Sequence, residues 1–134
     1  MSKILDQYTD FVDGVTSDAS KDIGALITAL QRLDEQGCDV ARLLTAFIGL
    51  NSEGGEGLDI VKKLAFHGKD YTQEVRQHLI KELGDNAWYW INGCIALGVD
   101  PEEVLVLNIE KLEARYPGGK FNVQRSENRA DGDI

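Results

Sequence analysis

The stretch TQEVRQHLIKELGDNAWYWINGCIALG, residues 72–98, decides the fold. Its apolar residues recur at intervals of three and four from Val75 to Ile95, which is the pattern of an amphipathic helix. Thr72 is a residue type that caps helix N-termini, and Gly98 is a type that ends helices. The stretch therefore predicts one long helix from Thr72 to Gly98.

The same helical pattern extends in both directions, and only two prolines occur in the chain. No pair of strands is visible, so we expect an all-α fold with a four-helix-bundle-like core and an extra N-terminal helix. We place this domain at residues 1–119, followed by an irregular polar tail at residues 120–134. Three further helices are expected to begin at Ser2, at Ser20 with a stop at Gly37, and at Asp39 with an end near His67. A fourth begins at Asp100, where Pro101 and Glu103 complete a start signal, and it ends at Tyr116.

Composition limits the partners that the chain can have. With 134 residues, 43% of them hydrophobic, it is long enough for one folded domain. Its net charge of −9 argues against nucleic acid as a general electrostatic partner. The most apolar stretch, residues 87–99, is too short to span a membrane. Two cysteines without metal-ligand spacing predict reduced thiols. Taken together, the charge, the short apolar stretch and the reduced thiols lead us to expect a cytoplasmic protein that binds neither nucleic acid nor membrane.

Two pairs of acids are the main candidates for chemistry. Glu53 and Glu56 are three residues apart on one expected helix, and Glu82 and Asp85 are three apart on the next. Four clustered carboxylates repel one another unless cations lie between them, and such oxygen ligands favour Mg²⁺ or Mn²⁺. The alternative is that these are ordinary solvated acids among the 23 in the chain. Glycines around the first pair favour a site, because they permit close approach of a backbone or a ligand.

The acid pairs and their flanks resemble the ExxE…ExxD signature of the MazG-like, all-α nucleoside triphosphate pyrophosphohydrolases. The resemblance covers about residues 20–120 and includes segments on both sides of the acids. These segments are Ile60-Val61-Lys62-Lys63, Phe66-His67-Gly68, Lys81-Glu82-Leu83-Gly84-Asp85 with Trp88-Tyr89, and Asn108-Ile109-Glu110-Lys111-Leu112-Glu113-Ala114-Arg115-Tyr116-Pro117. Ser52, Gly54 and Gly57 depart from the family pattern, which often has an acid or a bulkier residue there.

The resemblance implies hydrolysis of an NTP or dNTP to the monophosphate and pyrophosphate, by water attack at the α-phosphorus. It implies that Glu53, Glu56, Glu82 and Asp85 are the metal-binding and catalytic residues. Mg²⁺ is the expected cofactor, with Mn²⁺ as a substitute, and Glu53 is our choice for the acid that orients or deprotonates the attacking water. The resemblance also implies a homodimer or homotetramer.

Substrate contacts are predicted on two later helices and beside the first acid pair. Asn108, Lys111 and Arg115 form one polar stripe that could hold phosphates and a sugar or base. The alternative is a solvated helix end whose cations complement the helix dipole. Lys63 is a weaker candidate of the same kind, and Trp88 could stack on a base, although such aromatics more often belong to a core or an interface.

Other readings of the sequence are possible. A di-iron bundle needs Glu-x-x-His pairs, and neither His67 nor His78 has an acid three residues before it. We interpret both histidines as structural or as neighbours of metal ligands. A non-catalytic acidic helical interaction module is the alternative function. The tail carries Arg125 and Arg129, which could lend a cation to a neighbouring subunit.

Overall fold

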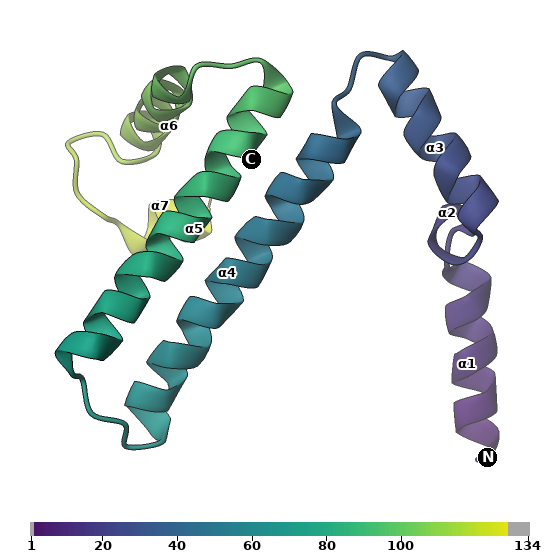
Figure 1. Cartoon of the computed structure of the whole chain (residues 1–134), viewed down its shortest axis with the longest axis horizontal. Helices are drawn as coiled ribbons and strands as arrows, with labels where there is room; N and C mark the ends of the chain where they lie inside the picture. The colour runs from purple at the N-terminus through teal and green to yellow at the C-terminus, as the bar shows by residue number, and fades with distance from the viewer. Residues whose placement is uncertain (1, 129–134) are drawn as a thin grey trace. The chain divides into compact units, whose positions relative to one another are not determined.

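The computed structural model describes residues 2–128, and within them the chain is helical and has no strand (Figure 1). The all-α fold class is therefore confirmed. The chain divides into two compact units, one up to Ala41 and one from Arg42 onward. The helices are α1 (Lys3–Val15), α2 (Asp18–Lys21), α3 (Ile23–Glu35), α4 (Val40–Phe66), α5 (Gln73–Leu97), α6 (Pro101–Arg115) and α7 (Val123–Glu127).

The first unit confirms one predicted helix start and corrects another. The Ser2 side chain accepts a hydrogen bond from the Leu5 backbone N–H, as an N-cap does. Ser20 does not begin the second long helix, because it lies within the short helix α2. Asp22 instead caps α3 through a 2.7 Å bond from the Ala25 N–H. A carboxylate two residues later thus takes the role expected of the Ser20 hydroxyl.

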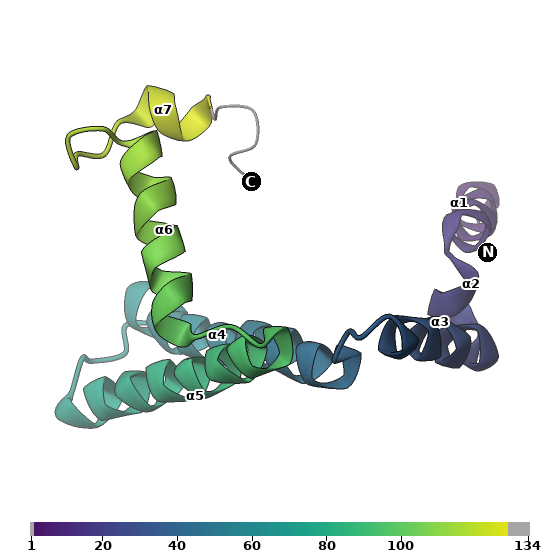
Figure 2. The same cartoon turned by 90° about the horizontal axis from the view of Figure 1, so that it is seen from above.

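The second unit is built on α4 and α5, which lie side by side and antiparallel (Figures 1 and 2). Thr72 caps α5 as predicted, since its hydroxyl accepts from the Val75 N–H. At the other end of the pair, Arg42 donates to the Asn92 side chain over 3.4 Å. This antiparallel pair contains the predicted acids.

The glycines of α4 differ in how closely other side chains approach them. The helix continues through them without a break. Gly49 is buried, and a Cβ at this position would overlap the Tyr89 ring on α5. At Gly57 a Cβ would meet Glu82 at an ordinary 3.8 Å, and at Gly55 it would meet nothing within 4 Å. The requirement for close approach is therefore confined to Gly49.

The chain after α5 follows the predicted signals until the tail. Gly98 ends α5 in the left-handed conformation, with φ of 64°. Asp100 then caps α6 by accepting from the Glu102 N–H at 2.8 Å. The tail is not wholly irregular, because Asn122 caps the short helix α7. Its cap bond is local and satisfies one otherwise unpaired N–H, which the polar composition did not suggest.

Few apolar side chains are buried within residues 2–128. Ala46, Ile60, Val75 and Cys94 are the buried hydrophobic residues of this part of the chain. Many large ones stay exposed, among them Leu83 at 70% and Ile109 at 54%. In the same described range, no helix combines the length and the apolar character needed to cross a membrane.

Candidate metal centre

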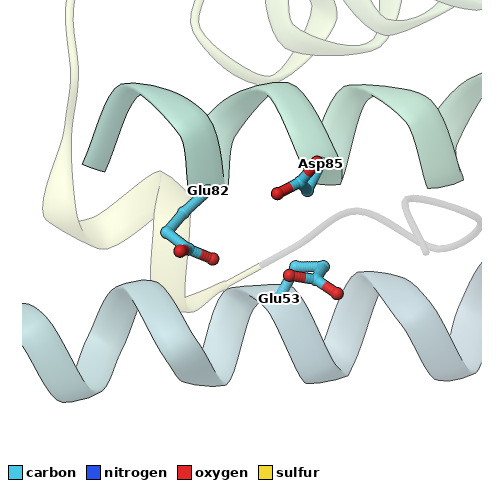
Figure 3. A group of neighbouring side chains, drawn as sticks. All are labelled: Glu53, Glu82 and Asp85. Atoms are coloured by element: carbon cyan, nitrogen blue, oxygen red, sulfur yellow. The ribbon is translucent and has the colours of Figure 1, made fainter. Parts of the chain in front are cut away.

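Three of the four predicted acids come together between α4 and α5. Glu53 projects from α4, and Glu82 and Asp85 project from α5, so that their carboxylates face one another (Figure 3). One oxygen from each lies within 4.8 Å of the others. The three-residue spacing places Glu82 and Asp85 on one face of α5, and the antiparallel packing of α4 places Glu53 opposite them.

Glu82 differs from the other two acids in its burial. It is 6% exposed and is the one buried charged residue among those described. Its Oε1 lies 3.0 Å from His78 Nε2, one turn earlier on α5. Its Oε2 is buried and has no hydrogen-bond partner in the described structure. A buried acceptor without a partner is costly, and a cation would satisfy it.

Electrostatics within the group act most clearly on Glu53. Desolvation raises the pKa of its carboxyl above the usual 4.5, and the negative charges of Glu56, Asp85 and Glu82 raise it further. A carboxylate whose charged form is disfavoured by like charges gains from a nearby cation. Glu53 is also only partly exposed, so solvent does not fully screen these charges.

Glu56 lies beside this group but does not belong to it. It is exposed and lines an open pocket of about 420 Å³ together with Asp59, Lys63, Lys69 and His78. Its charge still contributes to the raised pKa of Glu53. The structure thus brings together Glu53, Glu82 and Asp85, and it places Glu56 on the adjoining pocket.

The predicted cation Lys63 faces the same pocket and is already paired. Its ammonium contacts the Asp59 carboxylate, which also pairs with Lys62 at 2.6 Å. Hydrogen bonds from Lys62 and Lys63 lower the pKa of Asp59 to about 2. Sequence analysis missed Asp59 and Lys69 as pocket residues, although the spacing of Asp59 with Lys63 was a signal of their pairing.

The other predicted substrate residues lie on α5 and α6. Trp88 is 58% exposed, three residues beyond Asp85, and its ring meets Tyr89 edge-on at 4.9 Å. Asn108, Lys111 and Arg115 belong to the C-terminal half of α6, which points away from α4 and α5 in Figure 2. The structure does not bring this stripe to the three carboxylates. Of the tail residues, Arg125 lies in α7, and Arg129 lies outside the described residues.

The donor set fits a hard divalent cation. It consists of carboxylate oxygens, which Mg²⁺ and Mn²⁺ prefer, and one of its members, Glu82, has a buried oxygen without a hydrogen-bond partner. Neither cysteine belongs to the group, and His78 contacts Glu82 from outside it.

Comparisons with protein-family models, with curated proteins and with solved structures found no match to this chain.

Proposed function

We propose that the protein is a metal-dependent nucleotide pyrophosphohydrolase, which converts an NTP or dNTP to the monophosphate and pyrophosphate. The observation that carries the proposal is the meeting of Glu53, Glu82 and Asp85 with an unpartnered, buried Glu82 oxygen. Resemblance of the two acid pairs and their flanks to the MazG-like enzymes supplies the reaction. Support beyond the motif itself comes from three of its four acids, which converge across two helices.

The cofactor proposed for this centre is Mg²⁺, with Mn²⁺ as a substitute, held by Glu53, Glu82 and Asp85 with Glu56 at its edge. When bound, the ion would offset the charge of the triphosphate oxygens and of the pyrophosphate leaving group. Glu53 is the proposed acid that orients or deprotonates the attacking water, because it faces Glu82 and Asp85 from the opposite helix. It would take a proton from the water that attacks the α-phosphorus.

We propose substrate contacts on α4, α5 and α6. Lys63 lines the pocket beside Glu56, and we propose that it contacts the phosphate chain after exchanging its contact with Asp59. Trp88, exposed beyond Asp85, offers a ring on which a base could stack. Asn108, Lys111 and Arg115 lie on the C-terminal half of α6, away from the carboxylates, so we propose that they serve a site on another copy of the chain.

That placement and the exposed apolar side chains favour a homodimer or homotetramer. An apolar surface of this extent is typical of subunit interfaces rather than of isolated domains. We also propose a cytoplasmic location, because the two cysteines are too few for a disulfide scaffold.

The exposed apolar side chains also favour a second candidate function, a non-catalytic acidic helical interaction module. This alternative leaves the unpartnered Oε2 of Glu82 without a purpose. Direct assay separates the two candidates.

The test is a panel of standard and modified NTPs and dNTPs, incubated with Mg²⁺ and analysed for monophosphate and pyrophosphate. We expect turnover of at least one nucleotide, loss of turnover in Glu53→Gln, and unchanged turnover in Glu74→Gln. Glu74 is a matched control, since it is an exposed glutamate at the start of α5 and outside the carboxylate group. Absence of turnover across the panel would favour the interaction module.

A further inference from the structure

His78 contacts the carboxylate group from outside, and the geometry of this contact is specific. His78 Nε2 lies 3.0 Å from Glu82 Oε1, one helical turn away on α5. An ionised carboxylate only accepts hydrogen bonds, so the imidazole must donate its Nε2–H. The His78 side chain is 58% exposed, whereas that of Glu82 is 8% exposed. The bond therefore joins a solvent-facing ring to a buried acid.

The two oxygens of Glu82 consequently have different surroundings. Oε1 is occupied by His78, and Oε2 is buried without a partner. The side chain comes from the same α5 face as Asp85 and lies opposite Glu53 (Figure 3). Rotation of a free carboxylate about its last bond exchanges its two oxygens, because this torsion is broad and roughly two-fold. A hydrogen bond to one oxygen removes that freedom.

We propose that His78 is a positioning residue of the carboxylate centre. By holding Oε1 of Glu82, it keeps Oε2 directed at the space shared with Glu53 and Asp85, and so it sets the affinity of the centre for a divalent cation. Partners that bond to the far side of metal ligands commonly change metal affinity about 10- to 100-fold when they are removed. This inference rests on the proposed metal centre.

His78 also lines the pocket that contains Glu56, Asp59, Lys63 and Lys69. One ring therefore borders both the carboxylates and the open pocket beside them. A ligand in that pocket would contact the residue that orients Glu82, so cation affinity and pocket occupancy are expected to be linked.

The test is Mn²⁺ binding to the full chain, measured by the loss of the free-ion electron paramagnetic resonance signal. We expect His78→Ala to weaken binding about 10- to 100-fold. His78→Gln keeps a side-chain N–H donor and should recover most of the affinity. His67→Ala is the matched control, because His67 lies in the turn after α4 and does not line the pocket. Circular dichroism checks that each variant keeps its helicity.

A second readout needs no metal. The carboxyl ¹³C resonance of Glu82 should shift in His78→Ala and stay in place in His67→Ala. Tight Mn²⁺ binding by wild type and by His78→Ala alike, or an unmoved Glu82 resonance, would overturn the positioning role alone. Failure of the wild-type chain to bind Mn²⁺ would instead overturn the metal centre, and the positioning role with it.

Discussion

Glu82 and its neighbours show how one buried carboxylate shapes the chemistry of the centre. Burial of a charge is costly unless the charge is paired, and His78 pairs with one oxygen only. Glu53 and Asp85 add like charge instead of relieving it. The metal-free centre is therefore electrostatically unfavourable, and this predicts how stability responds to pH and to cations.

Glu53 should make the metal-free protein less stable as pH rises. Its pKa in the folded state is raised above the usual 4.5, so the folded state holds the proton more tightly than the unfolded state does. The stability that this provides is complete below about pH 4.5 and is lost as pH rises through the raised pKa. We expect urea unfolding in the presence of a chelator to give the same free energy of unfolding for Glu53→Gln and wild type below that pH. At pH 7 the free energy of unfolding of Glu53→Gln should be the larger of the two. If the free energies of unfolding of the two proteins changed in parallel with pH, this prediction would be wrong.

Asp85→Asn should reduce the stabilisation that Mg²⁺ provides. A ligand that binds the folded state at 100 times its Kd stabilises it by about 2.7 kcal/mol, and a lost carboxylate weakens that binding. Without metal, the Tm of the variant should equal or exceed that of wild type, because one repulsive charge is gone. Thermal unfolding with and without Mg²⁺ measures both effects. An equal Mg²⁺-dependent rise in Tm for both proteins would remove Asp85 from the centre.

At the scale of the helices, packing of α4 against α5 includes a close approach at Gly49. Gly49→Ala should destabilise the fold by about 1–3 kcal/mol, because its Cβ would overlap the Tyr89 ring. Gly55→Ala, on the same helix and with nothing within 4 Å of the added Cβ, should stabilise it by about 0.5–1 kcal/mol. Denaturant midpoints of the two variants should move in opposite directions. Equal shifts would show that Tyr89 moves away at little cost.

Helix ends were largely predictable from the sequence, because their causes are local. Thr72, Gly98 and Asp100 act as expected, since each satisfies or terminates a turn within a few residues. The start at Ser20 was wrong because Asp22, also a good cap, lay two residues further on. Helix α7 was missed because its five residues carry too little periodicity to stand out.

The candidate site was predictable to a lesser degree. Spacing along one helix placed Glu82 and Asp85 on one face, and the structure agrees. Which of Glu53 and Glu56 would join them depends on the rotation of α4 about its axis when it packs on α5. That rotation follows from contacts such as Gly49 with Tyr89, which join residues far apart in the chain. Sequence periodicity does not specify such contacts.

At the scale of the whole molecule, the exposed apolar side chains predict association. Only four hydrophobic residues within residues 2–128 are buried, and many large ones on α5 and α6 are exposed. Light scattering at low micromolar concentration should report at least twice the monomer mass of 14.8 kDa. A monomer with full turnover would exclude a site completed by Asn108, Lys111 and Arg115 of another copy. Removal of the residues after Gly119 then tests Arg125 and Arg129. Unchanged kinetics in the shortened protein would show that these two arginines take no part.

The most direct test of the central claim is the fate of the water oxygen during hydrolysis. A nucleotide that is turned over in the presence of Mg²⁺ is hydrolysed in ¹⁸O-water, and the products are followed by ³¹P NMR. If water attacks the α-phosphorus at this centre, the label appears in the nucleoside monophosphate, unlabelled pyrophosphate is released, and Asp85→Asn abolishes both products. Labelled inorganic phosphate with a nucleoside diphosphate, or full turnover by Asp85→Asn, would contradict the proposed function.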